Sequence, residues 1–474
     1  MSAGPDLELA AGLERSGRHA DAEAAYQRAI GETPQDAVAR FNFACFLRRR
    51  GRLEEALESH QAALDLAIEN PEEVFSNMAV IQGELRRDAA AKMLLERALA
   101  INPDYPPALF NLALHFEEHG ERDRALALFR RILEIDPGWH NALVRLAYAE
   151  TVREADGEVV RRLRRALRRS NLEPFMRESL YFALGKALDD CGRYDEAFEQ
   201  YTLGNAASRP RLSRYDHGVV SQGVGQVIEG FVPELMARAT PVSEAPLVFI
   251  TGMFRSGSTL FEQVLAAHPA VTAGGEIEYF MRFPLSLDPA DWPAIAQGYV
   301  DYLGRTFPGK DIVTNKRPDA YAYLGMLRAA FPNARFVNTV RDPRDTALSI
   351  FFQQFDGRMG YAADFADIAH HQRQYRRLMS HWRGQFGDAI FDADYDAYVR
   401  DPRGVTERLL AFLGLPWHEG CLEFHRNENR VRTASVTQVR EPLYTRSSGR
   451  WRNYERQLAP FLPALEGTSS STTS

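Results

Sequence analysis

The sequence predicts a protein of class α plus α/β, with an N-terminal α-solenoid followed by an α/β domain built on a central parallel sheet. Two observations predict this class. The first half of the chain repeats with a period of 34 residues, and the second half alternates short apolar runs with helical stretches. A length of 474 residues is enough for two or three such domains.

Small residues and prolines carry the 34-residue period. Pro103 and Pro137 are 34 residues apart, and so are Ala91 and Ala125. Small residues let the two helices of a hairpin approach closely, and the proline stops the second helix. The pattern resembles the tetratricopeptide repeat and predicts about six repeats over residues 5–208, of which the fifth is degenerate.

Three further segments are expected after the repeats. Residues 209–244 are expected to connect the domains and to contain one helix, GVVSQGVGQVIEGFV. Residues 245–465 are expected to form the α/β domain, with strands in PLVFITG, DIVTNK, RFVNTVRDP and AIFDADY. Residues 466–474 contain nothing to bury and are expected to be disordered.

The bulk composition argues against several classes of protein. A formal net charge of -7 disfavours general nucleic-acid binding, because nucleic-acid-binding domains are usually basic. Three widely spaced cysteines support neither a disulfide framework nor a metal cluster. The chain shows no apolar run of membrane-spanning length and no secretory leader pattern, so we expect a cytoplasmic protein without a membrane partner.

The loop after the first expected strand has the features of an anion site. Gly252 and Gly257 have the spacing of the phosphate-binding loop G-x-x-x-x-G-K-[ST], but Ser258 replaces its lysine. Backbone N–H groups converge where the helix STLFEQVLAAH begins, and Arg255 adds a positive charge. We therefore expect this P-loop-like segment to bind phosphate through Arg255, Ser256, Gly257, Ser258 and Thr259.

Two more cations stand at the ends of later expected strands. Lys316 ends DIVTNK, and Arg341 follows RFVNTV. No clear magnesium-binding carboxylate accompanies them, so no metal is expected. Such a site suits metal-free transfer of a sulfuryl group from a donor whose charge is balanced by protein cations.

Two segments together resemble the signatures of sulfotransferases that use 3′-phosphoadenosine-5′-phosphosulfate (PAPS). FRSGSTLFEQVLAAHP resembles the loop that holds the 5′-phosphosulfate, and VRDPRDTALSIFF resembles the segment that holds the 3′-phosphate. In the second segment Arg341 and Ser349 have the family's eight-residue spacing, which can return the serine towards the arginine. The likeness runs from Ala245 to Tyr454 and implies PAPS as donor and adenosine 3′,5′-bisphosphate (PAP) as product.

Among these enzymes the chain is most similar to the tyrosylprotein type. That resemblance assigns the catalytic base to Glu276, after AAHPAVTAGG, where cytosolic small-molecule sulfotransferases generally use histidine. It also implies that Lys316 contacts the bridging oxygen of the donor and that Tyr395 lies near the adenine. Ser435 is expected near the transferring group, and Arg450 at the 3′-phosphate.

Several residues depart from the tyrosylprotein pattern or could offer an alternative base. Phe254 stands where related loops carry proline, and Glu278 stands where the tyrosylprotein enzymes carry an arginine useful for acidic peptides. Arg282 is retained at the next matching position. His370 and His371 lie in a polar helical run and are expected to be structural or solvated.

The expected acceptor is the tyrosine hydroxyl of a protein or peptide, in a context that need not be acidic. The repeats are expected to recruit or orient this protein acceptor. One alternative keeps the donor and sends the sulfuryl group to a carbohydrate or small-molecule hydroxyl. Another treats the catalytic half as degenerate and the repeats as a non-catalytic scaffold for partner proteins.

Overall fold

The protein is described from a computed structural model, which covers residues 5–285, 288–427, 439–440, 443 and 447–466. The chain divides into two compact units, Met1–Ala149 and Glu150–Ser474. The predicted disordered tail lies outside the described residues except for Glu466. Within the described part of the chain, every helix is too short or too polar to cross a membrane.

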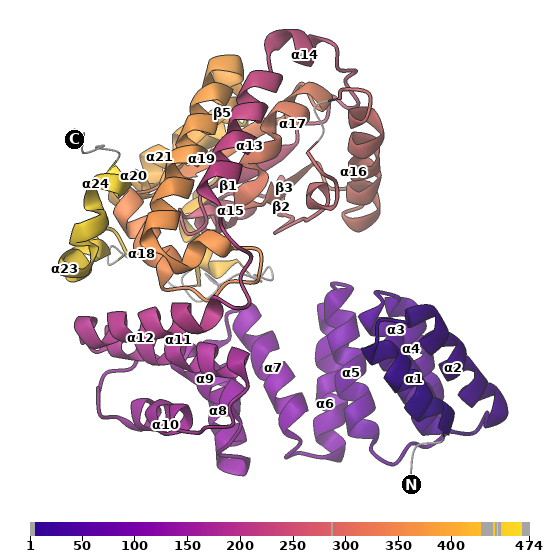
Figure 1. Cartoon of the computed structure of the whole chain (residues 1–474). Helices are drawn as coiled ribbons and strands as arrows, with labels where there is room; N and C mark the ends of the chain where they lie inside the picture. Colours follow the sequence, from indigo (N-terminus) through magenta and orange to yellow (C-terminus); the bar gives the residue numbers. More distant parts are fainter. Residues whose placement is uncertain (1–4, 286–287, 428–438, 441–442, 444–446, 467–474) are drawn as a thin grey trace. The chain divides into compact units, whose positions relative to one another are not determined.

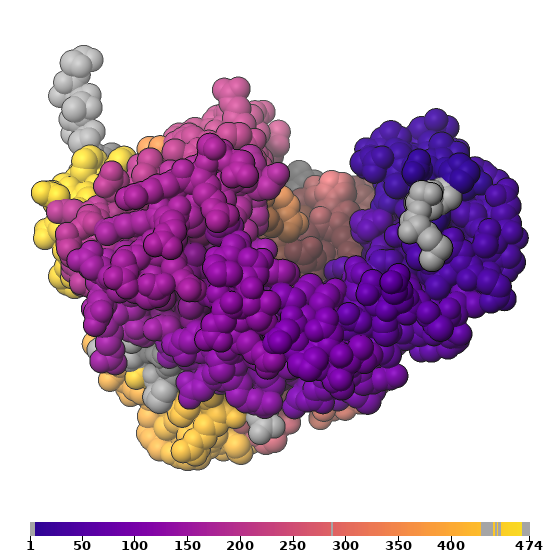
Figure 2. Space-filling view, turned by 90° about the horizontal axis from the view of Figure 1, so that it is seen from below, coloured from indigo at the N-terminus to yellow at the C-terminus, as the bar shows by residue number. Residues whose placement is uncertain are grey.

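The first unit consists of antiparallel helix hairpins with small residues at their seams. Ala22, Ala56 and Ala125 are fully buried, as the repeat pattern predicts for positions where two helices meet. Along residues 5–149 neighbouring helices pack in sequence order (Figure 1), which confirms the predicted α-solenoid. On the surface of this unit the colour passes in the same order from indigo to purple (Figure 2). Its helices are α1 (Pro5–Arg15), α2 (His19–Glu32), α3 (Ala37–Arg49), α4 (Leu53–Asp65), α5 (Pro71–Glu84), α6 (Asp88–Ile101), α7 (Pro106–Glu118), α8 (Arg122–Ile135) and α9 (His140–Ala149).

The second unit begins with the last helices of the repeat sequence. In its hairpin of α11 and α12, Gly185 lets Tyr201 pack closely, since a Cβ at that glycine would lie 3.0 Å from the tyrosine ring. The predicted connecting helix is α13, which packs against α19 (Figure 1). The helices of this part are α10 (Glu158–Leu167), α11 (Pro174–Asp190), α12 (Tyr194–Ser208), α13 (His217–Gly230) and α14 (Pro233–Ala237).

A five-stranded parallel sheet in the order β2-β3-β1-β4-β5 forms the centre of the second unit. Its strands are β1 (Val248–Gly252), β2 (Val271–Ala273), β3 (Ile312–Lys316), β4 (Arg335–Val340) and β5 (Ile390–Asp394). The four predicted strands and their parallel pairing are confirmed. Sequence reasoning missed β2 because three residues are too few to show an apolar run.

Helices cover both faces of the sheet (Figure 1). Ile250 packs in a cluster with Phe261 of α15 and Leu409 of α21, whereas its neighbour Phe249 stacks on Tyr299 of α16. This alternation follows from the two-residue period of a strand. The helices are α15 (Ser258–Ala266), α16 (Trp292–Thr306), α17 (Leu324–Ala330), α18 (Pro343–Phe351), α19 (Phe365–Phe386), α20 (Tyr395–Arg400), α21 (Pro402–Phe412), α23 (Glu455–Leu458) and α24 (Leu462–Glu466).

Short 3₁₀ turns complete the second unit. They are η1 (Phe280–Arg282), η2 (Pro318–Tyr323), η3 (Gly360–Ala363), η4 (Gly387–Ala389), η5 (Glu419–Arg426), η6 (Arg450–Tyr454) and η7 (Ala459–Phe461). The chain leaves the central β1 for β2 on one side and later crosses from β3 to β4 on the other side. In such sheets, ligands bind in the crevice at the carboxyl ends of the strands. Arg255, Glu276, Lys316, Arg341 and Tyr395 end or closely follow these strands, so the topology gathers them at one edge.

Candidate active site

The loop between β1 and α15 has an unusual backbone conformation. Arg255 has a φ of 68° and Gly257 a φ of 105°, both in the left-handed region that non-glycine residues rarely adopt. Ser256 holds the loop from inside, because its hydroxyl donates to the Met253 carbonyl at 2.6 Å and lies 2.6 Å from the hydroxyl of Thr339. Ser256 is therefore buried in the loop, whereas its neighbours face the cavity.

A cavity of about 620 Å³ opens where the strands end. Lys316 does not line the cavity itself but donates a hydrogen bond to Glu276, which does. Ser435 lies outside the described residues. In the described ranges, no group of three or more His, Cys, Asp or Glu side chains is placed to hold a metal ion. The expected site residues that line the cavity are Arg255, Gly257, Ser258, Thr259, Glu276, Arg341, Ser349, Tyr395 and Arg450.

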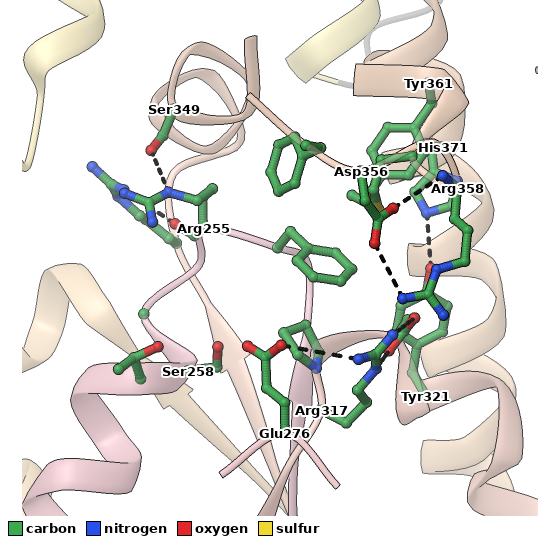
Figure 3. Close-up of a pocket in the computed structure, with 18 of the residues that line it drawn as sticks. Arg255, Ser258, Glu276, Arg317, Tyr321, Ser349, Asp356, Arg358, Tyr361 and His371 are labelled. Carbon is green, nitrogen blue, oxygen red and sulfur yellow. Dashed lines mark hydrogen bonds and ion pairs between the residues drawn. The ribbon is translucent and has the colours of Figure 1, made fainter. Parts of the chain in front are cut away.

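The expected base, Glu276, is held between two cations. Lys316 Nζ donates a hydrogen bond to Glu276 Oε1, and the Arg317 guanidinium lies 3.9 Å from Oε2. Lys316 is 1% exposed, whereas the Glu276 side chain is 34% exposed. Figure 3 shows Glu276 between Ser258 on one side and Arg317 on the other. The carboxylate can therefore reach a proton on a group bound in the cavity, with an ammonium group beside it.

The arginines expected at the donor form a connected group. Arg255 Nε donates to Ser349 Oγ at 3.1 Å, and Arg341 Nη1 donates to the Arg255 carbonyl at 3.2 Å. Ser349 thus returns to Arg255, not to Arg341 as its spacing suggested. The Arg341 guanidinium lies 4.8 Å from the centre of the Tyr395 ring. Its Nε is buried and has no hydrogen-bond partner among the residues that the structure describes.

This end of the cavity suits an anion with several negative charges and a flat ring. A buried N–H donor without a partner is costly, and an anionic oxygen would satisfy it. Gly257 lets the loop approach Tyr395 closely, since a Cβ there would lie 2.9 Å from the ring. Guanidinium groups and the N-terminus of α15 then face the same space.

A buried carboxylate that sequence reasoning missed supports Glu276. Glu262 on α15 is 3% exposed and accepts hydrogen bonds from Gly275 N and Thr314 Oγ1, both at 2.9 Å. Burial raises the pKa of Glu262, and the nearby Lys316 partly offsets this rise. Glu262 therefore fixes the residue just before Glu276 and the strand that carries Lys316. An acidic residue within an otherwise apolar helix was the available signal.

The far end of the cavity has aromatic walls around a neutral histidine. His371 Nε2 lies 2.8 Å from the hydroxyl of Tyr321, and Nδ1 lies 3.3 Å from the hydroxyl of Tyr215. The Tyr361 ring stacks on the imidazole at 3.8 Å (Figure 3). Burial lowers the pKa of His371 to about 3, so the imidazole is a weaker base than an ordinary histidine. Its contacts with the two tyrosine hydroxyls agree with the structural role expected for His371.

A charged network borders the aromatic end. Glu278 accepts hydrogen bonds from Arg317 Nη1 at 2.8 Å and from Arg358 Nη2 at 3.2 Å. Burial opposes the ionisation of Glu278, but these arginines outweigh it and lower the pKa of the carboxyl. Asp319 and Asp356 pair with the same two guanidinium groups. The residue that departs from the tyrosylprotein pattern thus neutralises arginines beside the cavity.

The segment expected to connect the domains also lines the cavity. Ser213, Tyr215 and Val220 all contribute to its wall. Ser213 N donates to the Gly357 carbonyl at 2.6 Å, and Ser213 Oγ donates to the Arg358 carbonyl at 3.2 Å. The turn-rich composition of residues 209–216 gave no indication that this segment lines the cavity. Its position depends on hydrogen bonds to a loop about 145 residues away in the chain.

The two parts of the chain are each similar to known protein families. Residues 246–292 and 287–419 match the model of a family described as "Sulfotransferase family". Residues 7–71 and 88–150 match two models described as "Tetratricopeptide repeat". A solved sulfotransferase domain from the Synechococcus PCC 7002 olefin synthase is 20% identical, with a TM-score of 0.38, over 49% of this chain and 98% of that one.

Relatives extend over one or both parts of the chain. An uncharacterized protein of Aquifex aeolicus (strain VF5) is 27% identical over 97% of this chain and 69% of its own length. The protein-tyrosine sulfotransferase of Drosophila melanogaster is 28% identical over 44% of this chain, and the match spans 47% of that enzyme. The chain therefore joins tetratricopeptide repeats to a sulfotransferase domain that is similar to protein-tyrosine sulfotransferases.

Proposed function

We propose that the protein transfers a sulfuryl group from PAPS to an acceptor hydroxyl, with tyrosine of a protein or peptide as the preferred acceptor. The observation that carries this proposal is the gathering of Arg255, Glu276 and the Glu276-bound Lys316 at one cavity. Sulfotransferases of this family generally use PAPS, and tetratricopeptide repeats generally bind proteins. Both properties agree with the two matched parts of the chain.

The donor end supplies the charges that the nucleotide requires. The N-terminus of α15, with Ser258 and Thr259, would hold the 5′-phosphosulfate, and Arg341 with Ser349 would hold the 3′-phosphate. Tyr395 would lie against the adenine, and Arg450 would add a second cation at the 3′-phosphate. The unpartnered Arg341 Nε gives this assignment its strongest support from the described residues.

The reaction needs one proton acceptor and several cations. PAPS supplies a sulfuryl group on a leaving phosphate, so a new S–O bond to the acceptor forms as the S–O bond to phosphate breaks. Glu276 takes the acceptor's proton as general base. Lys316 donates a hydrogen bond to the bridging oxygen that keeps the electron pair, and Arg255 stabilises charge on the transferring group. Ser435 is proposed to assist there as well.

The aromatic walls favour an aromatic acceptor. Tyr321, Tyr361 and Phe355 line the end of the cavity beyond Glu276, where a phenol ring would find apolar contacts. A tyrosine side chain would then direct its hydroxyl towards the base. The adjacent carboxylates pair with Arg317 and Arg358, so an acidic peptide has fewer unpaired cations to meet in this described region.

Transfer assays with labelled PAPS test the proposed function. Tyrosine peptides, glycans and small phenols are offered in parallel, and we expect label on the peptides. Glu276→Gln should lower kcat by about 10²–10⁴-fold, the usual contribution of a general base, while PAP still binds. Glu419→Gln changes an exposed glutamate that pairs with Arg403 and serves as the matched control.

Each other outcome selects a different function. Label on glycans or phenols alone would move the acceptor to a carbohydrate or small molecule. Transfer to none of the three, without PAP binding, would favour the non-catalytic scaffold. Full activity of Glu276→Gln would remove the assignment of the base.

A further inference from the structure

The donor end of the cavity is in contact with the last helix hairpin of the repeat sequence. Arg450, which lines the cavity, directs Nη2 to Asp189 Oδ2 on α11 at 2.5 Å. The Tyr454 hydroxyl donates to the other carboxylate oxygen of Asp189. The Asp189 side chain is 13% exposed and the Arg450 side chain 28% exposed, so solvent screens this ion pair weakly.

The backbone around Arg450 is held from the opposite side. Asp345 on α18 accepts hydrogen bonds from Gly449 N at 2.6 Å and from Trp451 N at 2.7 Å. These bonds fix the main chain on either side of Arg450. At the other end of the side chain, the guanidinium lies 5.5 Å from the centre of the Phe352 ring, and the Asp189 carboxylate accepts its hydrogen bond.

Aromatic packing keeps the hairpin in place beside the site. The Tyr201 ring of α12 stacks on Phe352 at 3.8 Å with an angle of 11° between the rings. Asn205 Nδ2 donates to the Phe351 carbonyl at 2.7 Å, at the C-terminal end of α18. α18 also carries Ser349, so the same helix contacts α12 and the donor end of the cavity.

From these contacts we propose that Asp189 is a positioning residue that orients the Arg450 guanidinium towards the 3′-phosphate of the donor. A carboxylate can occupy one edge of a guanidinium while the remaining N–H groups stay available to a phosphate. The donor site then extends into the repeat sequence, beyond the part of the chain that matches the sulfotransferase family. This inference rests on the proposed use of PAPS.

Titration calorimetry with PAP and with adenosine 5′-monophosphate tests this role, because the two ligands differ in the 3′-phosphate. In the unmodified full-length chain, PAP should bind more tightly. Asp189→Asn should weaken PAP binding about tenfold and leave the monophosphate within about twofold, because only the 3′-phosphate contact depends on Arg450. Combined with Arg450→Ala, Asp189→Asn should cause no further loss.

The control is Asp195→Asn in the same hairpin, which removes an exposed carboxylate that pairs with Arg456. It should leave both affinities unchanged. An equal fall for both ligands in Asp189→Asn would show a general structural role and overturn the inference, as would unchanged PAP binding. If the unmodified chain does not distinguish the two ligands, the proposed donor itself fails. A melting curve for each variant identifies misfolding, and Tyr454→Phe then tests the second contact of Asp189.

Discussion

At the scale of single residues, the proposed base, Glu276, is positioned with the help of a second carboxylate, Glu262. Glu262 is buried, and it accepts hydrogen bonds from the residue before Glu276 and from the strand that ends in Lys316. An ionised carboxylate loses hydration when it is buried, and hydrogen bonds with a nearby ammonium recover only part of that loss. Glu262 thus orders the site at a cost to the stability of the fold.

The pKa of Glu262 predicts how this cost varies with pH. Burial raises the pKa of Glu262 above that of an ordinary glutamate, so protonation favours the folded state. The stability gained from the protonated form is present at low pH and is lost as the pH rises through the folded-state pKa. Glu262→Gln keeps an acceptor oxygen but cannot ionise. The parent chain loses stability as Glu262 ionises, so the free energy of unfolding of the variant relative to the parent should increase with pH.

Urea unfolding at a series of pH values measures this difference. Glu419→Gln is the control, and its difference from the parent should vary little with pH because Glu419 is exposed. A Glu262→Gln variant that loses relative stability as the pH rises would contradict the prediction. Such a result would mean that attraction between ionised Glu262 and Lys316 exceeds the cost of burial.

At the scale of elements, the loop between β1 and α15 is fixed by backbone conformation as much as by side chains. Gly257 caps the N-terminus of α15 with a φ of 105°, and the Tyr395 ring lies against it. The serine at Ser256 locks the preceding turn. The loop carries Ser258 in place of the lysine of nucleotide triphosphatases. Two cations, Arg255 on the loop and Lys316 at the end of β3, lie at the cavity instead.

Gly257→Ala should therefore damage donor binding. The added Cβ would lie 2.9 Å from the Tyr395 ring. The alanine would also have to keep a positive φ that L-residues rarely adopt, which costs about 1–3 kcal/mol. We expect PAP affinity to fall by about tenfold or more. Gly304→Ala on α16, where a Cβ has open space, is the control and should change neither affinity nor stability by much. Unaltered PAP binding in Gly257→Ala would refute the close approach of loop and tyrosine.

At the scale of the whole molecule, the boundary between compact units does not coincide with the end of the repeats. The units meet at Ala149 and Glu150, whereas the repeat pattern continues to residue 208. The reason lies in α12, whose Phe198 stacks on Phe351 of α18 and whose Tyr201 stacks on the adjacent Phe352 within the second unit. The last hairpin thus has the sequence pattern of a repeat but packs as part of the second unit.

Calorimetric unfolding tests this division. Two units with separate cores should give two transitions, and PAP should raise only that of Glu150–Ser474. Tyr201→Ala should lower the PAP-sensitive transition, with a loss of about 3–5 kcal/mol for a buried aromatic residue. Phe46→Ala, in the core of the first unit, should lower the other transition. A Tyr201→Ala effect on the PAP-insensitive transition would place the hairpin with the first unit.

The sequence by itself determined the solenoid, four of the five strands and the place of the cations Arg255, Lys316 and Arg341 at or after strand ends. These follow from local periodicity and from the rule that parallel strands end on the same side. Glu276 was expected only from the family resemblance, because the short strand before it, β2, shows no apolar run. Only the tertiary structure revealed Glu262 beneath the base, His371 in the cavity wall and Asp189 at Arg450. Each depends on contacts between residues far apart in the chain, about which local patterns carry no information.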